Sequence, residues 1–551
     1  MTARLLPLLT SLALLVAAPA ALAQGVPLAG EGKEIQPIAH LPIESPDQQK
    51  NEIELAGDYA YVSHDFGMDI INISNPAKPT LEGKWKCEAG WGDIDLSADG
   101  NLAVLTNAHG GECFEGGTAI ALVDITDKRK PKTLSTITLD DAKVEYVHTA
   151  MLSDNLLFLN TQIWAGYPQD NYHVPVYDVT NRKAPKFVNH IKFPGPAVAH
   201  DSYLDRRPDG KKIFYSAGVH STDTFDLTDV MKPVRMQTAT TPDQTISHQF
   251  EPNHNRSIGI LVDESAVDGG LLGSGPAVCG KLGTGAAAFD VGSVQFFKLN
   301  EDGTLANGGA APVGTYNAPP TAQETCTSHV FVQAPTENRM TQAYYTNGAR
   351  VIDFEDPVNP KELGFFKAEP QVKYWSAKPH RGYIFATDMV RGLDIMRYTG
   401  EGGAKWPTTA GAYEEVRAQR HGVPFKPVTG ANGSSTTTAP LPKPQGGSTA
   451  AERSVGRFAF TAKLKKIKGK KGKKVKLTIV FYSGKKSVQK LSFKRKAGKK
   501  AAARVSGVAE TGTYRYTVKN GRKTIKRGTF KVGRTAGVSL SPNAKMAARV
   551  R

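Results

Sequence analysis

The chain has 551 residues, of which 40% are hydrophobic, and it contains 54 Gly, 34 Pro and 4 Cys. This length exceeds what one hydrophobic core usually serves, so we expect at least two folding units. Four cysteines in such a length exclude a small disulfide-held scaffold, and the apolar content excludes a wholly disordered chain. The net charge of +17 conceals a split, because residues 451–551 carry +29 and the rest of the chain carries −12.

The first 23 residues have the pattern of a secretory signal peptide. Arg4 precedes an apolar run from Leu5 to Ala18, and small residues at Ala21 and Ala23 form a cleavage site. A membrane anchor, the alternative, needs about 20 apolar residues and fits less well. Residues 1–23 are therefore predicted to be removed. The mature chain is expected to have no integral membrane segment and to be extracellular or in the cell envelope.

Residues 35–400 contain one sequence unit that recurs seven times. In its clearest form the unit is a strand ending in an apolar-Asp-apolar step, followed by a polar turn and a Pro. Successive copies are 44 to 55 residues apart, except for one interval of 72 that holds a Gly-rich insertion around Gly269–Gly285. The copies are centred on Asn72, Asp124, Asp178, Asp226, Lys298, Asp353 and Arg397.

This spacing, with about four short strands per unit, is typical of the blades of a β-propeller. One twisted sheet cannot bury both of its faces, so the copies must pack against one another in a ring. We predict an all-β fold with a seven-bladed β-propeller over residues 35–400, in which the strand Ile35–Leu41 completes the last blade. Stacked β-sandwiches, the alternative, would not show such an even spacing.

The repeats resemble the LVIVD-repeat family of secreted or cell-surface β-propeller proteins of bacteria and archaea. The family is named for a Leu-Val-Ile-Val-Asp-like step, which is matched most nearly by Ala121-Leu122-Val123-Asp124. The resemblance covers residues 35–400 and implies an extracellular propeller. It implies no particular reaction, because the family is defined by its repeats.

The remaining residues divide by composition into three parts. Residues 401–450 are interpreted as a linker rich in Pro, Gly, Ser and Thr, with a short helix expected at Tyr413–Gln419. Residues 451–535 alternate like strands and are interpreted as a small, basic, Ig-like β-sandwich, since Gly512–Tyr516 resembles a late strand of such folds. Residues 536–551 are interpreted as a flexible tail.

The basic charge of residues 451–535 predicts a polyanionic partner. A charge this large attracts polyanions over a distance of about a Debye length, ~10 Å at moderate salt. For an exported protein, we predict attachment to a polyanionic component of the cell envelope. The alternative is that lysines only keep a domain with many strand edges soluble.

Four histidines stand at the same position of consecutive repeats, where each innermost strand begins. Inner strands line the channel of a propeller, so these side chains should converge near its axis. Neutral imidazole is a common ligand of copper, zinc and iron, and the pattern predicts a transition-metal site. The predicted ligands are His148, His200, His248 and His329. The same rim would receive His64, His109, His220 and Lys373. Alternatively, the imidazoles bind channel water or backbone carbonyls and hold no cofactor.

This arrangement is similar to that of two copper enzyme families, the methanethiol oxidases (selenium-binding-protein-like) and the nitrous oxide reductases. Both families set histidines around a propeller axis, and the resemblance implies a metal-dependent oxidoreductase. Two carboxylates, Asp201 and Glu251, are candidates for orienting the ring nitrogens.

The four cysteines can form two disulfides without crossing the ring. We predict the pairs Cys87–Cys113 and Cys279–Cys326, each stabilising the fold by ~3–4 kcal/mol in the chain-entropy model. Four free thiols, the alternative, fit an oxidising compartment less well.

Two functional hypotheses follow. In the first, the protein binds an unknown small molecule or protein at the propeller rim and is held at the cell envelope by its basic domain. In the second, it is a metal-dependent oxidoreductase that uses the histidine cluster. The sequence identifies no catalytic residue for either hypothesis.

Overall fold

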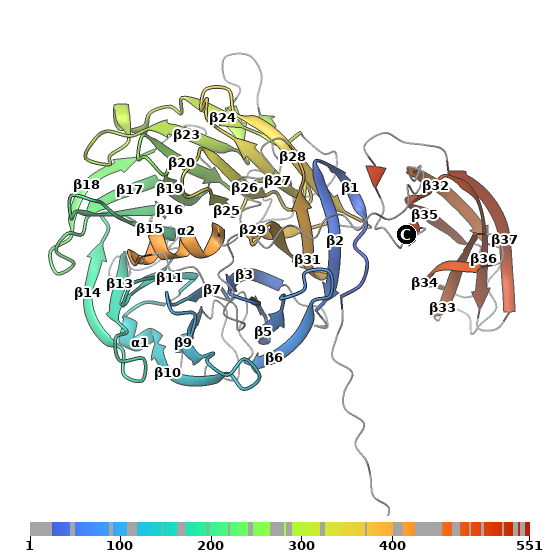
Figure 1. Ribbon diagram of the computed structural model, residues 1–551, viewed down its shortest axis with the longest axis horizontal. Coiled ribbons are helices and arrows are strands. Elements are labelled where there is room, and N and C mark those ends of the chain that lie inside the picture. The colour runs from blue at the N-terminus through green and yellow to red at the C-terminus, as the bar shows by residue number, and fades with distance from the viewer. Residues whose placement is uncertain are drawn as a thin grey trace, which may run out of the picture.

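The structure is a computed structural model in which consecutive antiparallel sheets form a ring (Figure 1). Among the described residues, no helix combines the length and the apolar character needed to cross a membrane. The structure describes residues 25–43, 50–87, 92–106, 118–145, 147–161, 172–195, 198–218, 221–240, 246–264, 280–282, 289–319, 326–369, 372–400, 412–424, 455–464, 474–483, 486–496, 501–520, 523–532, 538–539 and 546–550.

Each ring sheet is built mainly from four strands that are neighbours in the sequence. The first three sheets consist of β3 (Lys50–Ala56), β4 (Tyr59–His64), β5 (Gly67–Asn72) and β6 (Thr80–Lys86); β7 (Ile94–Leu96), β8 (Leu102–Thr106), β9 (Thr118–Asp124) and β10 (Lys132–Thr138); and β11 (Thr149–Ser153), β12 (Leu156–Asn160), β13 (His173–Asp178) and β14 (Lys186–Lys192).

The next two sheets consist of β15 (Ala199–Arg206), β16 (Lys212–Gly218), β17 (Ser221–Asp226) and β18 (Val234–Ala239); and β19 (Ser247–Pro252), β20 (Ile258–Asp263), β23 (Val294–Lys298) and β24 (Gly314–Tyr316). The last two contain β25 (Phe331–Gln333), β26 (Arg339–Ala343), β27 (Ala349–Asp353), β28 (Lys361–Ala368) and β1 (Gly30–Lys33); and β29 (Tyr374–His380), β30 (Tyr383–Asp388), β31 (Gly392–Tyr398) and β2 (Ile35–Pro42).

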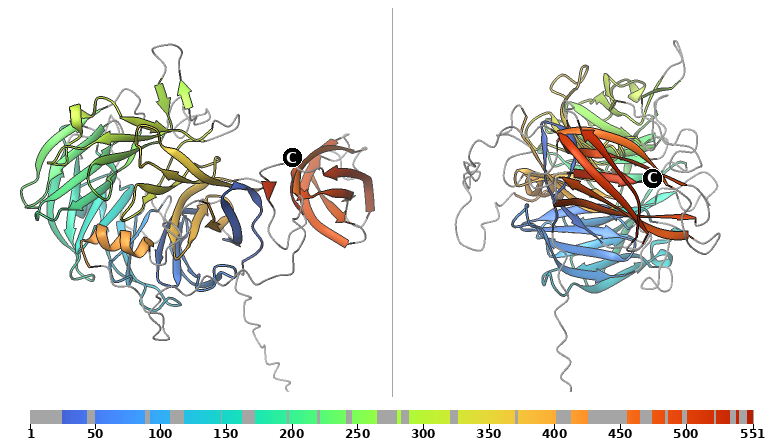
Figure 2. Two further views of the ribbon diagram at one scale, coloured as in Figure 1. Left: turned by 45° about the horizontal axis from the view of Figure 1, so that its top comes forward. Right: turned by 90° about the vertical axis from the view of Figure 1, so that its right-hand side faces the viewer.

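The Gly-rich insertion predicted from the sequence lies between β20 and β23. Within it, β21 (Gly280–Leu282) and β22 (Phe289–Val291) pair as a hairpin outside the ring sheets, which projects from the ring in Figure 2. There are two short helical segments in the described part of the ring: α1 (Leu139–Ala142) follows the outer strand β10, and a 3-10 turn at Ala306–Gly309 lies between β23 and the outer strand β24.

The repeated Asp has a structural role that explains the repeat. It ends the third strand of its sheet, and its side chain accepts a hydrogen bond from the backbone N–H two residues later. Examples are Asp124 with Thr126 (2.9 Å), and Asp226 with Thr228 (2.8 Å). Such Asx turns fix the direction of the chain as it leaves the strand.

The hydrophobic core is divided among the interfaces between neighbouring sheets. Each cluster of buried side chains in the ring joins at least two consecutive sheets; for example, Leu122 and Leu152 belong to one cluster of the second and third sheets. The last sheet packs on the first in the same way, through a cluster that contains Ile395 and Ile53. Burial between sheets therefore continues around the whole circle.

The ring is closed by a strand from the start of the described chain. As predicted, β2 pairs antiparallel with β31, and this pairing places residues 35–42 beside residues 392–398. The His40 ring bonds its cross-strand partner Asp394 at 2.6 Å from Nδ1 to Oδ1, and Asp394 is fully buried. The closing pair thus combines a backbone ladder with a buried polar contact.

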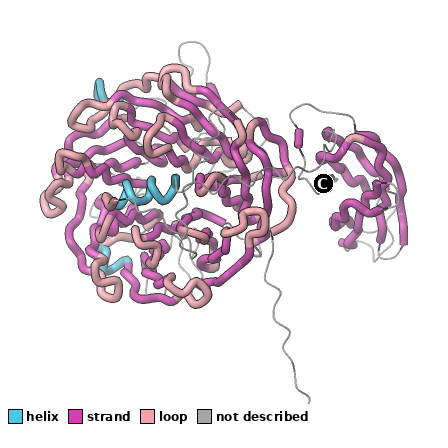
Figure 3. The backbone as a smooth tube through the Cα atoms, in the orientation of Figure 1, coloured by secondary structure: helices cyan, strands magenta, loops and turns pink. Residues whose placement is uncertain are grey.

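The helix α2 (Ala412–His421) lies within the range predicted as a linker, where a short helix was expected, but it packs on the ring. It crosses the centre of the ring in Figure 1 and stands out among the strands in Figure 3. Tyr413 and Val416 belong to the hydrophobic cluster that joins the last and first sheets. Residues 412–421 are therefore part of the ring structure and not of a linker.

The C-terminal residues form a second unit of two sheets around its own core. The sheets consist of β32 (Val455–Leu464), β35 (Ala501–Glu510) and β39 (Met546–Val550); and of β34 (Lys486–Lys496), β33 (Lys474–Ser483), β36 (Gly512–Asn520) and β37 (Lys523–Val532). The Ala-rich strand β35 was not predicted. The predicted flexible tail is wrong for two segments, because β39 pairs with β35, and β38 (Val538–Ser539) pairs with β1.

Removing the His40 ring tests the closure of the ring. We expect His40→Ala to lower the free energy of unfolding by about 1–3 kcal/mol, because the buried Asp394 carboxylate loses a hydrogen-bond partner. Urea unfolding measures the change. Gln36→Ala, an exposed position on the same strand, is the control and should have little effect. Equal effects of the two substitutions would contradict this role of His40.

Candidate metal centre and channel cavity

The four predicted histidines lie side by side at the start of consecutive inner strands. His200 and His248 lie within β15 and β19, and His148 and His329 come just before β11 and β25. The ring centroids are 4.3 Å apart for His148 and His200, 4.1 Å for His200 and His248, and 4.1 Å for His248 and His329. All four side chains are buried.

A carboxylate that the sequence analysis did not select lies beside three of these rings. Glu264 follows β20, and its carboxylate oxygens are 4.0 Å from His200 Nε2, 3.7 Å from His248 Nε2 and 3.6 Å from His329 Nε2. One ligand atom from each of His200, His248 and Glu264 lies within 4.8 Å of the others, which is a spacing suited to a metal ion. His148 adjoins the cluster but is not part of this set.

Besides the three imidazoles, a tyrosine hydroxyl contacts Glu264. Tyr345 Oη donates a hydrogen bond to Glu264 Oε1 at 2.5 Å, and Lys373 Nζ lies 6.0 Å from the centre of the Tyr345 ring. Burial raises the pKa of Glu264 to about 8, although the Tyr345 hydrogen bond opposes the shift. Tyr345 has a φ of +32°, a conformation that costs energy in a residue other than Gly and that occurs often at functional sites.

The imidazoles are held in their neutral form. Burial lowers the pKa of His200 and of His329 to about 3 and holds the pKa of His248 well below its ordinary value. His329 Nδ1 lies 2.7 Å from the Trp375 carbonyl oxygen, which can only accept, so Nδ1 carries the proton. The lone pair of His329 Nε2 then faces the Glu264 carboxylate, an arrangement that a cation between them would stabilise.

The Nδ1 atoms of His200 and His248 are on the side of Asp201. His248 Nδ1 is 3.5 Å and His200 Nδ1 is 3.8 Å from the Asp201 oxygens, so Asp201 lies where a carboxylate orients metal-binding imidazoles. Glu251, the other sequence candidate, does not do so. Its carboxylate forms an ion pair with Arg420 and accepts hydrogen bonds from the amides of Gln249 and Gln333.

The remaining predicted rim residues have different outcomes. His64 bonds Asp69 at 3.2 Å and is not part of the histidine cluster. His109 and His220 lie outside the described residues. Cys87 and Cys326 are buried and neither is a free thiol, but Cys113 and Cys279 lie outside the described residues, so both disulfide pairs stay predictions.

The position of Glu264 at the rim could have been inferred from the order of the strands. The second strand of each sheet returns to the rim where the first begins, so a residue that follows β20 lies at the histidine level. Asp263, the residue before Glu264, ends β20, and its side chain accepts hydrogen bonds from the backbone N–H groups of Ile246 and Gly292.

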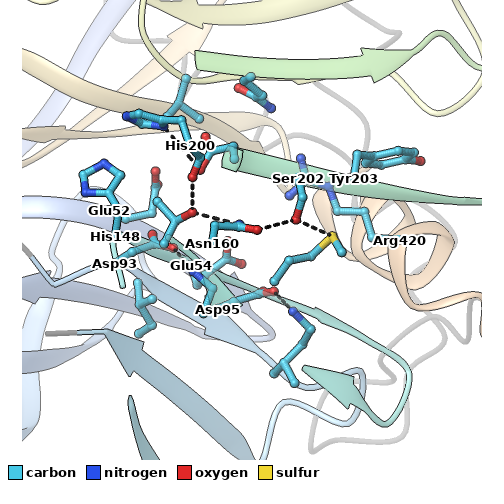
Figure 4. Close-up of a pocket in the computed structure, with 18 of the residues that line it drawn as sticks. Glu52, Glu54, Asp93, Asp95, His148, Asn160, His200, Ser202, Tyr203 and Arg420 are labelled. Atoms are coloured by element: carbon cyan, nitrogen blue, oxygen red, sulfur yellow. Dashed lines mark hydrogen bonds and ion pairs between the residues drawn. The ribbon is translucent and has the colours of Figure 1, made fainter. Parts of the chain in front are cut away.

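Between the histidine cluster and α2, the channel holds a cavity of about 100 Å³ (Figure 4). Its wall includes Glu52 and Glu54 of β3, Asp93 and Asp95 at β7, and side chains of α2. Lys378 Nζ lies 3.1 Å from Glu52 and 2.7 Å from Glu54, and all three side chains are buried. The cations of this cavity are therefore largely matched to particular carboxylates.

Side chains of α2 fasten the helix over the cavity. The Tyr413 hydroxyl donates to Glu54 at 2.7 Å, and the Arg417 guanidinium donates to the Leu55 carbonyl. Arg420 pairs with Glu251, and the His421 ring bonds the Leu96 carbonyl at 2.9 Å. The helix thus closes one end of the channel with contacts to several different sheets.

Comparisons with known proteins match the chain to an LVIVD repeat at residues 50–86, the first sheet of the ring. No curated protein matches. Similar solved structures include a functionally unknown protein from Desulfotomaculum acetoxidans DSM 771, with 12% identity, 61% of this chain and 95% of that chain covered, and a TM-score of 0.40. They also include the WD40 β-propeller domain of Doa1, with 10% identity and a TM-score of 0.41. That match covers 66% of this chain and 96% of the Doa1 chain. The resemblance to copper propellers stays a prediction.

Removing the cation between Glu52 and Glu54 tests the charge pairing in the channel. We expect Lys378→Met to lower the free energy of unfolding by about 3–5 kcal/mol, because two buried carboxylates lose their common partner. Chemical denaturation measures the loss. Adding Glu52→Gln to Lys378→Met should recover part of it, and Lys186→Met, at an exposed position of β14, is the control. A double variant no more stable than Lys378→Met would contradict the pairing.

Proposed function

We propose that this β-propeller protein, which contains an LVIVD repeat, is a metal-dependent oxidoreductase. The proposed metal ligands are His200, His248 and Glu264, with His329 as a further ligand. The observation that carries the proposal is the convergence of three imidazole Nε2 atoms on one buried carboxylate. Two histidines and a carboxylate form the ligand set of non-haem iron(II) oxygenases, and imidazole also suits copper and zinc.

The surrounding residues support this ligand set. Buried neutral imidazoles are ready to bind a cation, because no proton has to leave before the lone pair is available. The Tyr345 hydroxyl holds one Glu264 oxygen, while the Trp375 carbonyl fixes the tautomer of His329. Iron or copper at this position would supply electron transfer or dioxygen chemistry, and burial would keep bulk water away from it.

We further propose a domain organisation for the whole protein. The ring sheets are the seven blades of one propeller, and the two C-terminal sheets form an Ig-like sandwich. The core shared by β33 and β35 supports the sandwich assignment. Residues 1–23 act as an export signal, so the mature protein is extracellular or in the cell envelope.

A second candidate function is attachment to a polyanionic envelope component through residues 451–535. The charge of +29 on residues 451–551 favours it, because only two acidic residues oppose 31 basic ones. In the described part of this unit, β37 exposes four cations: Lys523, Lys526, Arg527 and Lys531. A row of this kind can follow a chain of phosphate or sulfate groups.

Metal content tests the oxidoreductase proposal. We expect protein incubated with Fe(II), Cu(II) or Zn(II) and then freed of excess metal to retain about one ion of at least one of these metals per chain. His248→Ala and Glu264→Gln should each weaken retention at least tenfold. His190→Ala, at a half-buried histidine outside the cluster, is the control. Elemental analysis gives the stoichiometry, and folded wild-type protein that retains none of the three metals would refute the metal centre.

Heparin chromatography tests the polyanion proposal. The full-length protein should elute at high salt with a steep salt dependence, because binding releases condensed counterions. Replacing Lys523, Lys526, Arg527 and Lys531 by Gln should lower both the eluting salt and the slope. Elution of the unmodified protein at low salt, or an unchanged slope in the variant, would contradict the proposal.

A further inference from the structure

The channel cavity between the histidine cluster and α2 contains more carboxylates than cations. Six carboxylates line it: Glu52, Glu54, Asp93, Asp95, Asp201 and Glu251. Its cationic lining residues are Lys378, Arg417 and Arg420. These groups come from several sheets and from α2 (Figure 4). The excess of carboxylates over cations is therefore created by the fold and is not a feature of one strand.

The cations are engaged with only part of this set. Lys378 pairs with Glu52 and Glu54, and Arg420 pairs with Glu251. Asp93 and Asp95 instead accept backbone N–H bonds, from Ala150 at 3.2 Å and from Leu152 at 2.7 Å. In the described part of the chain, no Lys or Arg lies within ion-pair distance of Asp93, Asp95 or Asp201.

This imbalance is energetically costly. Burial raises the pKa of Asp93 well above its usual value, and the charges of Glu52 and Asp201 add to the shift. Burial and Glu54 raise the pKa of Asp95 to about 7. The charge of Lys378 opposes the pKa shift of Asp93, and the charge of Arg420 opposes that of Asp95, but neither cancels the effect of burial. A cationic occupant would therefore stabilise the ionised carboxylates in this part of the channel.

A second observation points to an occupant of the same cavity. His248 lines the cavity and is 2% exposed, and neither of its ring nitrogens has a hydrogen-bond partner among the described residues. Its Nε2 faces Glu264, whereas its Nδ1 is on the Asp201 side. An unsatisfied polar atom in a polar cavity indicates a ligand or water.

The size and spacing of the cavity select the kind of cation. Apart from His200, His248 and Glu264, no three acidic, His or Cys side chains of the described residues bring ligand atoms within 4.8 Å of one another, so Asp93 and Asp95 do not form a compact site for a bare metal ion. A cavity of about 100 Å³ has room for several water molecules or for a small organic cation. Met151 and Trp375 add apolar wall beside the carboxylates.

We propose that this cavity binds a small primary amine as its ammonium ion, with the charged group among Asp93, Asp95 and Asp201. An ammonium group can be held by one or two carboxylates while its remaining N–H donors bond neutral acceptors or water, whereas a bare metal ion needs several converging ligands. The short alkyl group would lie against Met151 and Trp375. The cavity shares His200, His248 and His329 with the proposed metal centre, but the carboxylates that would hold the amine are distinct from Glu264, which is not part of the cavity wall.

Calorimetric titration of the full-length protein with methylammonium and ethylammonium tests the proposal. We expect saturable binding of at least one of them, and at least tenfold weaker binding by Asp93→Asn and by Asp95→Asn. Asp127→Asn, at an exposed turn, is the control. Thermal unfolding of each variant establishes that it is folded, and the two Asn variants provide independent tests.

Three outcomes would overturn the proposal. These are no heat of binding with either amine, equal binding of methanol or ethanol, and stronger competition by Ca²⁺ or Na⁺ than by the amines. Glu264→Gln separates this proposal from the metal proposal, because it should lose metal retention and keep amine binding. Loss of amine binding in folded Glu264→Gln would show that the two sites are one and would also contradict the inference.

Discussion

The structure depends on one antiparallel pairing, that of β2 with β31. Each ring sheet buries its faces only against its neighbours. The last and first sheets must therefore pack against each other, or each would leave one apolar face exposed to water. The strand from residues 35–42 completes the last sheet, and the cluster containing Ile53 and Ile395 then seals the circle. Closure thus provides both the final hydrophobic interface and the central channel.

Closure also explains the chemistry of the channel. His200, His248 and His329 are far apart in the sequence, yet each begins an inner strand and therefore reaches the same level of the axis. The cavity between these histidines and α2 is lined by carboxylates of the first two sheets. Arg420 of α2 and Lys378 of the last sheet line the same cavity. The wall between the two levels is formed by the imidazoles, with Glu264 on one side and Asp201 on the other.

Features that recur from repeat to repeat could be predicted from the sequence, whereas features that occur once in the chain were missed. The Asp of each unit recurs because it forms an Asx turn, and the histidines stand out because they recur at one strand position. Glu264 occurs once, after a second strand, so no repeated pattern marks it. The helix α2 was expected to be short and was assigned to a linker, since only tertiary contacts such as that of Tyr413 with Glu54 reveal that it belongs to the ring. The strand β35 was missed because its Ala-rich sequence has little β-propensity.

The most direct test of this account is the X-ray absorption spectrum of the metal-loaded protein. Imidazoles from three different sheets can surround one ion only if the circle of sheets closes as described. The imidazole side chains must also face Glu264. The account predicts a coordination shell of nitrogen and oxygen, with the scattering pattern of at least two imidazole rings and no sulfur. A shell that contains sulfur, or one without imidazole scattering, would contradict it.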